Sequence, residues 1–219
     1  MVSVKKEEEE IFLELKAQLF ERPNSAPLHY NLGLAYARRG ELDEAISEFK
    51  QAIAINPGLV EAYVNLGGIY FRKGNVEGCI EQNLKALECD PGFVQGYVNL
   101  GFAYFQQEKY EEAIAQYQKA IKVAPQFPQA YANLGNIYLQ QGDLTAAVDE
   151  NKKALEIDPN FSLAHNNLAI AFFRKGDYSS ALLYLDNALR LGFPVNPELG
   201  KALDPYRGEP SEGLNNLKI

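Results

Sequence analysis

Apolar residues recur at helical spacing in two blocks between successive prolines along most of the chain. In one such segment the blocks are Leu66, Ile69 and Tyr70, then Ile80, Leu84 and Leu87. A short polar stretch, RKGN, separates the two blocks, as is typical of a turn between helices. The pattern therefore predicts a pair of helices in each segment.

The predicted helix pairs repeat with a period of 34 residues. Prolines, which cannot continue a helix, end the segments at positions 23, 57, 91, 125 and 159. Small residues recur at three positions of each repeat, as with Gly67, Cys79 and Ala86, which predicts closely packed helix axes. Because each unit of such an array contacts its neighbours, the core is expected to extend along the array.

The residues at these positions resemble those of the tetratricopeptide repeat (TPR) family. The fourth repeat matches most fully, with Tyr131, Leu134, Gly135, Tyr138, Gly142, Ala147, Ala154 and Pro159. The resemblance implies an all-α fold, a right-handed α-solenoid of helix-turn-helix repeats. The expected segments are a tail and capping helix (1–25), five repeats (26–59, 60–93, 94–127, 128–161, 162–195) and a short helix with a disordered tail (196–219).

Four positions depart from this repeat pattern, one of which is Phe193, where a sixth proline would stand. Glu108 stands where the other repeats have a glycine between the paired helices. Asn83 and Asn151 occupy a site that the other repeats fill with Phe49, Tyr117 and Leu185. We expect these two amides either to be partly exposed or to bond to a neighbouring helix.

The net charge indicates which kinds of partner are disfavoured, and the cysteines indicate the redox state of the compartment. The net charge of -8 and the absence of any basic run disfavour nucleic acid and anionic membranes as partners. Cys79 and Cys89 lie too far apart on one predicted helix for a disulfide, and we interpret both as small core residues in a reducing compartment. Without a secretory signal or a long apolar run, the chain is expected to be cytoplasmic, with no membrane insertion.

No pattern of catalytic or metal-binding residues emerges. His29 and His165 occupy the repeat position that holds Tyr63, Tyr97 and Tyr131 elsewhere, so we interpret them as packing aromatics. The sequence contains neither a glycine-rich phosphate loop nor paired CxxC motifs. We therefore predict that the protein is not an enzyme and needs no metal or cofactor.

One asparagine recurs in the first helix of every repeat, at Asn31, Asn65, Asn99, Asn133 and Asn167. An asparagine inside a helix costs up to about 0.7 kcal/mol relative to alanine, so some interaction must compensate. Its amide can bond both the N–H and the C=O of a peptide unit. First helices line the concave face of TPR proteins, and this row is similar to the asparagine ladder in the TPR region of O-linked N-acetylglucosamine transferase. The alternative is that each amide bonds a neighbouring helix end.

Residues near each asparagine are expected to line the same groove. Those one position before and three after it are Tyr30, Leu34, Val64, Gly68, Val98, Phe102, Ala132, Asn136, Asn166 and Ile170. Further along the first helices come Arg38, Arg72, Gln106, Gln140 and Arg174. These longer side chains either contact acidic residues of a ligand or are solvated helix ends.

The resulting hypothesis is a non-enzymatic scaffold that binds an extended segment of a partner protein in its groove. The alternative is a structural module that forms homo-oligomers through its repeat ends or its carboxyl-terminal tail.

Overall fold

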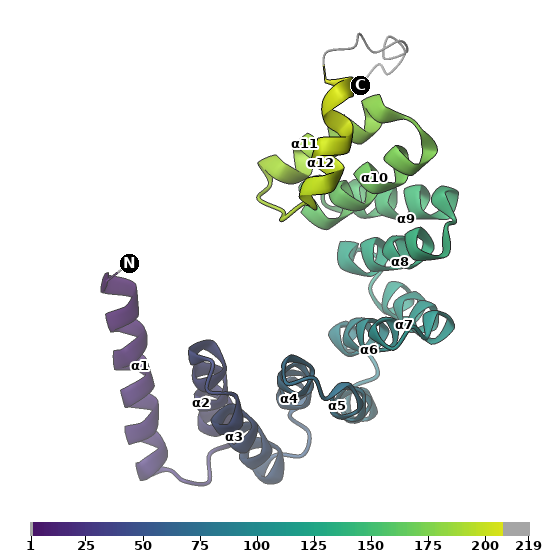
Figure 1. The fold of residues 1–219 in the computed structure, drawn as a ribbon. Helices are drawn as coiled ribbons and strands as arrows, with labels where there is room; N and C mark the ends of the chain where they lie inside the picture. The colour runs from purple at the N-terminus through teal and green to yellow at the C-terminus, as the bar shows by residue number, and fades with distance from the viewer. Residues whose placement is uncertain (1, 208–219) are drawn as a thin grey trace. The chain divides into compact units, whose positions relative to one another are not determined.

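The computed structural model describes residues 2–207, with side chains from residue 9 onward, and within this range it contains helices and no strands. The helices are α1 (Val2–Glu21), α2 (Ala26–Arg39), α3 (Leu42–Ile55), α4 (Val60–Arg72), α5 (Val76–Cys89), α6 (Val94–Gln106), α7 (Tyr110–Val123), α8 (Pro128–Gln141), α9 (Leu144–Ile157), α10 (Ser162–Lys175), α11 (Tyr178–Arg190), α12 (Pro197–Leu203) and a 3₁₀ turn, η1 (Asp204–Tyr206) (Figure 1). The predicted all-α fold class is confirmed.

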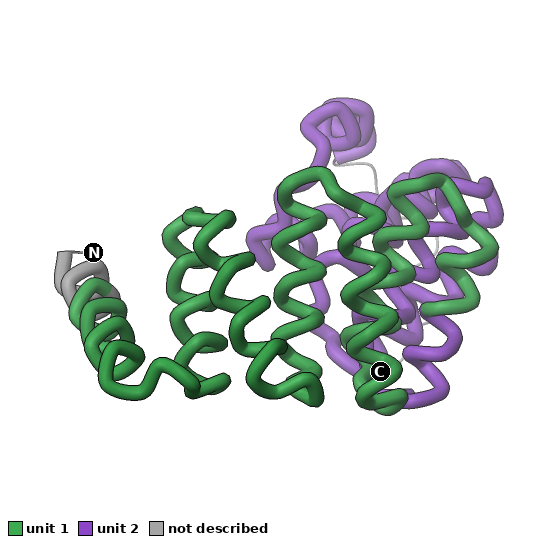
Figure 2. The backbone as a smooth tube through the Cα atoms, turned by 90° about the horizontal axis from the view of Figure 1, so that it is seen from below, with its two compact units in different colours: residues 1–116 green, residues 117–219 purple. Residues whose placement is uncertain are grey.

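The chain divides into two compact units, residues 1–116 and 117–219, with the boundary inside α7 (Figure 2). In unit 1, each helix from α1 to α6 packs against the next, and α4 also packs against both α2 and α6. In unit 2, α8 to α11 pack in the same succession, α8 also contacts α10, and α12 contacts α11. Each unit is therefore a series of packed helix pairs.

Each predicted repeat contains one pair, which we call its first helix (α2, α4, α6, α8 or α10) and its second helix (α3, α5, α7, α9 or α11). Several second helices begin at a side-chain cap, which satisfies a backbone N–H that has no partner inside the helix. Asp143 accepts a hydrogen bond from the backbone N–H of Ala146 at 3.0 Å, for example. The expected closing helix corresponds to α12, while the predicted disordered tail lies outside the described residues.

Small residues on the first helices allow the second helix of the same repeat to pack closely. A Cβ atom added to Gly33 would lie 2.8 Å from Phe49 Cε1, and one added to Gly67 would lie 2.6 Å from Asn83 Nδ2. Both separations are shorter than van der Waals contact, so a larger residue at either position would force Phe49 or Asn83 to shift. The prediction of close helix packing at the small-residue positions is confirmed.

The turn between paired helices uses a left-handed backbone conformation, which glycine adopts without strain. Gly40 and Gly142 have φ angles of 80° and 81° at this position. Glu108 takes the same place in the third repeat with a φ of 59°, although its Cβ disfavours that region. The departure seen in the sequence is thus a strained turn in an otherwise regular array.

The two cysteines of α5 differ in their surroundings. Cys79 is buried, and this burial raises the pKa of its thiol to about 11, against the opposing hydrogen bond from Asn83. Cys89 is exposed at the last residue of the helix, with its Sγ 3.4 Å from the Pro57 carbonyl oxygen. The interpretation as a core residue is confirmed for Cys79 and wrong for Cys89, because a helix end reaches solvent.

Candidate functional site

The five repeated asparagines lie on the first helices but differ in exposure. Asn31 on α2 is exposed, and Asn65, Asn99 and Asn133 on α4, α6 and α8 are half-buried. Asn167 on α10 retains only 2% of its surface. The amides of the first four asparagines are therefore accessible to a ligand to different degrees, and that of Asn167 is not.

Two asparagines of unit 1 bond within the protein. Asn65 Nδ2 donates to the hydroxyl of Tyr30 on α2 at 3.2 Å and to the backbone oxygen of Glu61 at 2.8 Å. Asn99 Nδ2 donates to Asn83 Oδ1 at 3.2 Å, and Asn99 Oδ1 accepts from Gln95 at 2.9 Å. In both cases the amide links its helix to a preceding one while part of the side chain stays exposed.

The asparagines of unit 2 are also linked to neighbouring helices. Asn167 Nδ2 donates to the Ala132 oxygen and to Asn151 Oδ1, both at 3.0 Å, so both of its N–H groups are used. Asn133 is hydrogen-bonded to Tyr117, a buried tyrosine whose pKa is raised by desolvation. These bonds join neighbouring helices, as the structural alternative supposes, but they are made to side chains and to a carbonyl inside a helix and not to helix ends. For Asn167 they leave no free donor.

Asn83 and Asn151 are fully buried and hold neighbouring helices together. Each Nδ2 donates to a carbonyl of its own helix, to Cys79 at 2.8 Å and to Ala147 at 2.7 Å. Each Oδ1 accepts from the repeated asparagine of the next first helix. The expected bond to a neighbouring helix is confirmed, and the expectation of partial exposure is wrong.

The apolar positions beside the asparagines separate into buried and exposed ones. Val64 and Val98 are 9% and 1% exposed and belong to the helix packing, whereas Tyr30, Leu34 and Asn136 are half-buried. Phe102 is 39% exposed, and its ring centroid lies 5.0 Å from that of Phe71 on α4.

Of these two rings, the sequence predicts Phe102 as a groove residue and does not predict Phe71. Phe71 lies three residues after Gly68, the repeat position of Phe102, and this helical spacing could have identified it. The pair joins the first helices α4 and α6 of unit 1.

Among the longer side chains, two arginines bind the preceding first helix. Arg72 Nη1 donates to the carbonyl of Ala37 at 3.2 Å, and Arg174 Nη1 donates to that of Leu139 at 2.6 Å. Both carbonyls lie in the last turn of a helix, where each also accepts the backbone N–H of the glycine that follows the helix, Gly40 or Gly142. Arg38, Gln106 and Gln140 are exposed.

The histidines pack as the sequence predicts. His29 Nε2 lies 2.9 Å from the Pro23 oxygen, and His165 Nε2 lies 2.9 Å from the Pro159 oxygen. At the same repeat position, the hydroxyl of Tyr97 donates to the Pro91 oxygen at 3.2 Å. The imidazoles thus make the contact that a tyrosine makes elsewhere.

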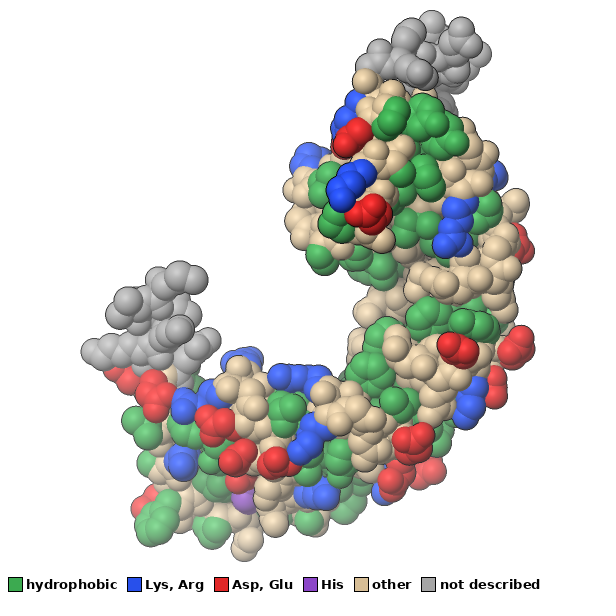
Figure 3. All heavy atoms as spheres, in the orientation of Figure 1, with side chains coloured by type: hydrophobic (Ala, Val, Ile, Leu, Met, Phe, Trp, Pro, Cys, Tyr) green, Lys and Arg blue, Asp and Glu red, His purple; other side chains and the backbone are tan. Residues whose placement is uncertain are grey.

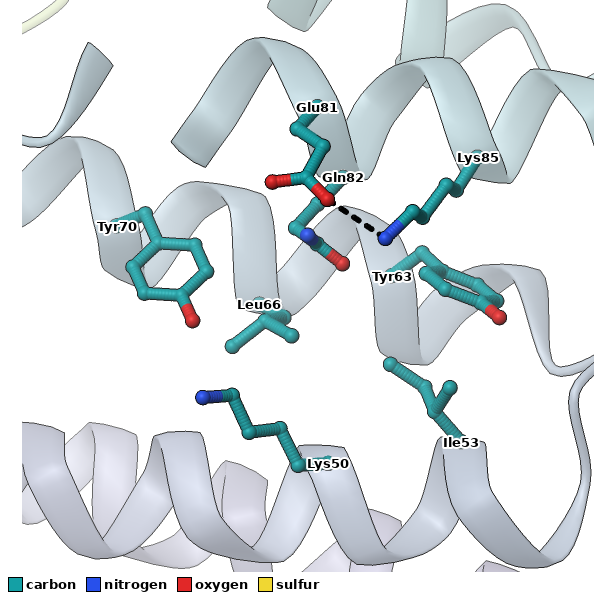
Figure 4. Close-up of a pocket in the computed structure, with 8 residues that line it drawn as sticks. All are labelled: Lys50, Ile53, Tyr63, Leu66, Tyr70, Glu81, Gln82 and Lys85. Carbon is teal, nitrogen blue, oxygen red and sulfur yellow. Dashed lines mark hydrogen bonds and ion pairs between the residues drawn. The ribbon is translucent and has the colours of Figure 1, made fainter. Parts of the chain in front are cut away.

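A pocket of about 430 Å³ opens between α3 and α5, and residues of α4 also line it (Figure 4). It is lined by Lys50, Ile53, Tyr63, Leu66, Tyr70, Glu81, Gln82 and Lys85. No motif in the sequence predicts this pocket, because its walls come from three helices. The pocket combines apolar walls with charged groups at its opening.

The surface chemistry of the described residues is mixed. On the face of unit 1 seen in Figure 3, acidic and basic side chains are interspersed. No cluster of three or more histidine, cysteine or acidic side chains suited to a metal occurs among the described residues. The same part of the chain has no helix with the length and apolar character needed to span a membrane.

Comparisons with known families identify the repeats. The model described as "TPR repeat" matches residues 35–74, 103–142 and 135–176. Models described as tetratricopeptide repeats match residues 60–93 and 83–115. A comparison with curated protein sequences finds no match.

Solved structures of several proteins are similar to the chain. MamA is 28% identical, with a TM-score of 0.62 over 76% of this chain and 91% of that chain. The pilF protein of Pseudomonas aeruginosa is 24% identical, with a TM-score of 0.75 over 85% of this chain and 86% of that chain. YrrB, described as a TPR protein with an unusual peptide-binding site, is 21% identical, with a TM-score of 0.62 over 88% and 97%.

Proposed function

The chain belongs to the tetratricopeptide repeat family, and we propose that this protein-interaction scaffold holds an extended segment of a partner protein against its first helices. The observation that carries the proposal is the set of accessible amides in one register on the first helices of unit 1, at Asn31, Asn65 and Asn99, beside the exposed ring of Phe102. Amides bind peptide backbone, and an exposed aromatic ring binds apolar side chains. The proposed activity is binding alone, with no catalytic step.

The five asparagines have different roles in this proposal. Asn31 makes no side-chain hydrogen bond with the described residues, so its amide is available to a peptide. Asn65 uses its Nδ2 within the protein and keeps its Oδ1 for a peptide N–H. Asn167 is assigned to helix packing, because it is buried and both of its donors are used.

An extended segment suits these amides geometrically. Its backbone rises about 3.3 Å per residue, so first helices packed about 10 Å apart would meet it at every third residue. The intervening side chains would contact Phe71, Phe102 and the half-buried Leu34. Recognition would then rest mainly on backbone hydrogen bonds, with apolar contacts adding selectivity.

A peptide library displayed on phage tests the proposal without knowledge of the natural partner. Peptides selected on the wild-type protein are titrated against Phe102→Ala and against Leu183→Ala, a matched control whose leucine is 53% exposed on a second helix. We expect Phe102→Ala to weaken binding about tenfold or more, as loss of a buried aromatic contact does. Equal affinity for wild type and Phe102→Ala contradicts the proposal.

Self-assembly is a second candidate function, favoured by apolar side chains exposed on α1. Phe20 is 86% exposed, and Ile11 and Leu13 are each 57% exposed. If α1 packs on another copy, the sedimentation coefficient rises with protein concentration and the rise disappears in Phe20→Ser. A concentration-independent monomer removes this candidate and leaves the peptide-binding proposal in place.

A further inference from the structure

The pocket between α3 and α5 has an equivalent in the fifth repeat that is filled by the protein's own aromatic ring. Tyr184 on α11 lies three repeats after Gln82, in the same register. Its ring is stacked on Phe172, with centroids 5.5 Å apart and planes inclined by 3°. It also contacts His165, with centroids 5.8 Å apart.

The surrounding residues correspond one by one. Leu155, Leu168, Phe172 and Tyr184 pack in one apolar cluster of unit 2. Three repeats earlier these positions are Ile53, Leu66, Tyr70 and Gln82, which all line the open pocket. The apolar walls are therefore alike, and the residue that enters the space differs, a tyrosine in the fifth repeat and a glutamine in the second. The charged pair Glu81 and Lys85 is also replaced, by Leu183 and Asn187.

The opening of the pocket carries a positive charge. Lys85 is paired with Glu81 at 2.7 Å, whereas Lys50 has no carboxylate within ion-pair distance among the described side chains. The Lys50 Nζ lies 6.0 Å from the centroid of the Tyr70 ring, and Figure 4 shows its side chain pointing into the pocket. An anionic group entering beside Lys50 would find a free cation there.

We propose that this pocket binds an aromatic side chain of a partner protein that carries a carboxylate close to the ring in sequence. The ring takes the place that Tyr184 takes in the fifth repeat, against Tyr70 and Leu66, and the carboxylate pairs with Lys50. Stacked aromatic rings and a partly desolvated ion pair both favour such a ligand. This site is lined by the second helices α3 and α5 together with Tyr63, Leu66 and Tyr70 of α4, and none of the repeated asparagines lines it.

N-acetyl-phenylalanine, which combines the ring with a free carboxylate, is a suitable probe. Titration followed by amide NMR shifts is expected to show binding to the wild-type protein, with the largest shifts at residues of α3, α4 and α5. Gln82→Tyr should fill the pocket from within, as Tyr184 does, and reduce binding at least tenfold. Gln116→Tyr, the same change one repeat later, is the matched control and should bind like wild type.

A second variant tests the charge without altering the walls. Lys50→Gln is expected to weaken binding of N-acetyl-phenylalanine about two- to fivefold, as loss of an exposed ion pair does, and to leave binding of its uncharged amide unchanged. Thermal melting of each variant verifies folding.

Three results would overturn the proposal. One is absence of shifts up to the solubility limit of the probe. Another is undiminished binding by folded Gln82→Tyr. The third is self-association abolished by both Phe20→Ala and Gln82→Tyr, because Phe20 and Glu21 of a second copy would then be the occupant.

Discussion

Asn167 on α10 donates a hydrogen bond of 3.0 Å to the amide oxygen of Asn151 on α9, and both side chains are buried. Asn99 and Asn83 make the same contact between α6 and α5 at 3.2 Å. The asparagine of one first helix thus joins its repeat to the preceding one. The exposure of the repeated asparagines decreases from Asn31, which is exposed, to Asn167, which is buried with both of its N–H groups hydrogen-bonded. Their roles can therefore be separated by mutation.

Stability should follow this gradation. Asn167→Ala leaves a buried amide oxygen at Asn151 without its partner, so we expect a loss of about 1–3 kcal/mol in the free energy of unfolding. Asn31→Ala removes an exposed amide and improves helix propensity, so stability should be unchanged or higher by up to about 0.7 kcal/mol. Chemical denaturation measures both values. Equal stability losses would show that exposure does not separate the two asparagines.

Relief of strain at Glu108 should stabilise the third repeat. Glycine tolerates the φ of 59° that Glu108 has in this turn. We therefore expect Glu108→Gly to increase the free energy of unfolding by about 1 kcal/mol. Gly142→Ala, at a φ of 81° in the fourth repeat, is the reciprocal control and should lose a similar amount. Denaturation midpoints of the two variants test this directly. A lower midpoint for Glu108→Gly would mean that the glutamate has a stabilising contact that outweighs its strain.

The thiols should differ in reactivity. At pH 8, iodoacetamide is expected to alkylate the exposed Cys89 and to spare Cys79, whose pKa of about 11 keeps it protonated and whose side chain is buried. Mass spectrometry of digested protein locates the adduct. Rapid labelling of Cys79 in the folded protein would contradict its burial.

The same shift predicts a pH dependence of stability. Because the pKa of Cys79 is higher in the folded protein than its ordinary value of 9.0, the folded state retains the proton longer as pH rises. The free energy of unfolding should therefore be unaffected by this group below pH 9 and should decline between pH 9 and 11. Cys79→Ala should lack that part of the decline, which urea titrations at several pH values would reveal.

The helices could be predicted from the sequence because their signals are local and repeated. The prolines and the small residues at positions such as Gly33 and Gly67 mark helix ends and close packing in every repeat. The partners of the amides could not be read in this way, since Asn151 meets Asn167 only after the two helices pack. The pocket was missed for the same reason, because Lys50, Tyr70 and Lys85 lie on three helices.

The central claim is that accessible amides on the first helices hold the backbone of a partner segment. Calorimetric titration of a peptide selected on the wild-type protein is the most direct test, applied to the double variant Asn31→Ala/Asn65→Ala and to Asn167→Ala. We expect the double variant to bind at least about tenfold more weakly, since each lost hydrogen bond contributes about 0.5–1.5 kcal/mol. We also expect Asn167→Ala to be less stable but to bind with wild-type affinity. Wild-type affinity in a folded double variant would contradict the claim.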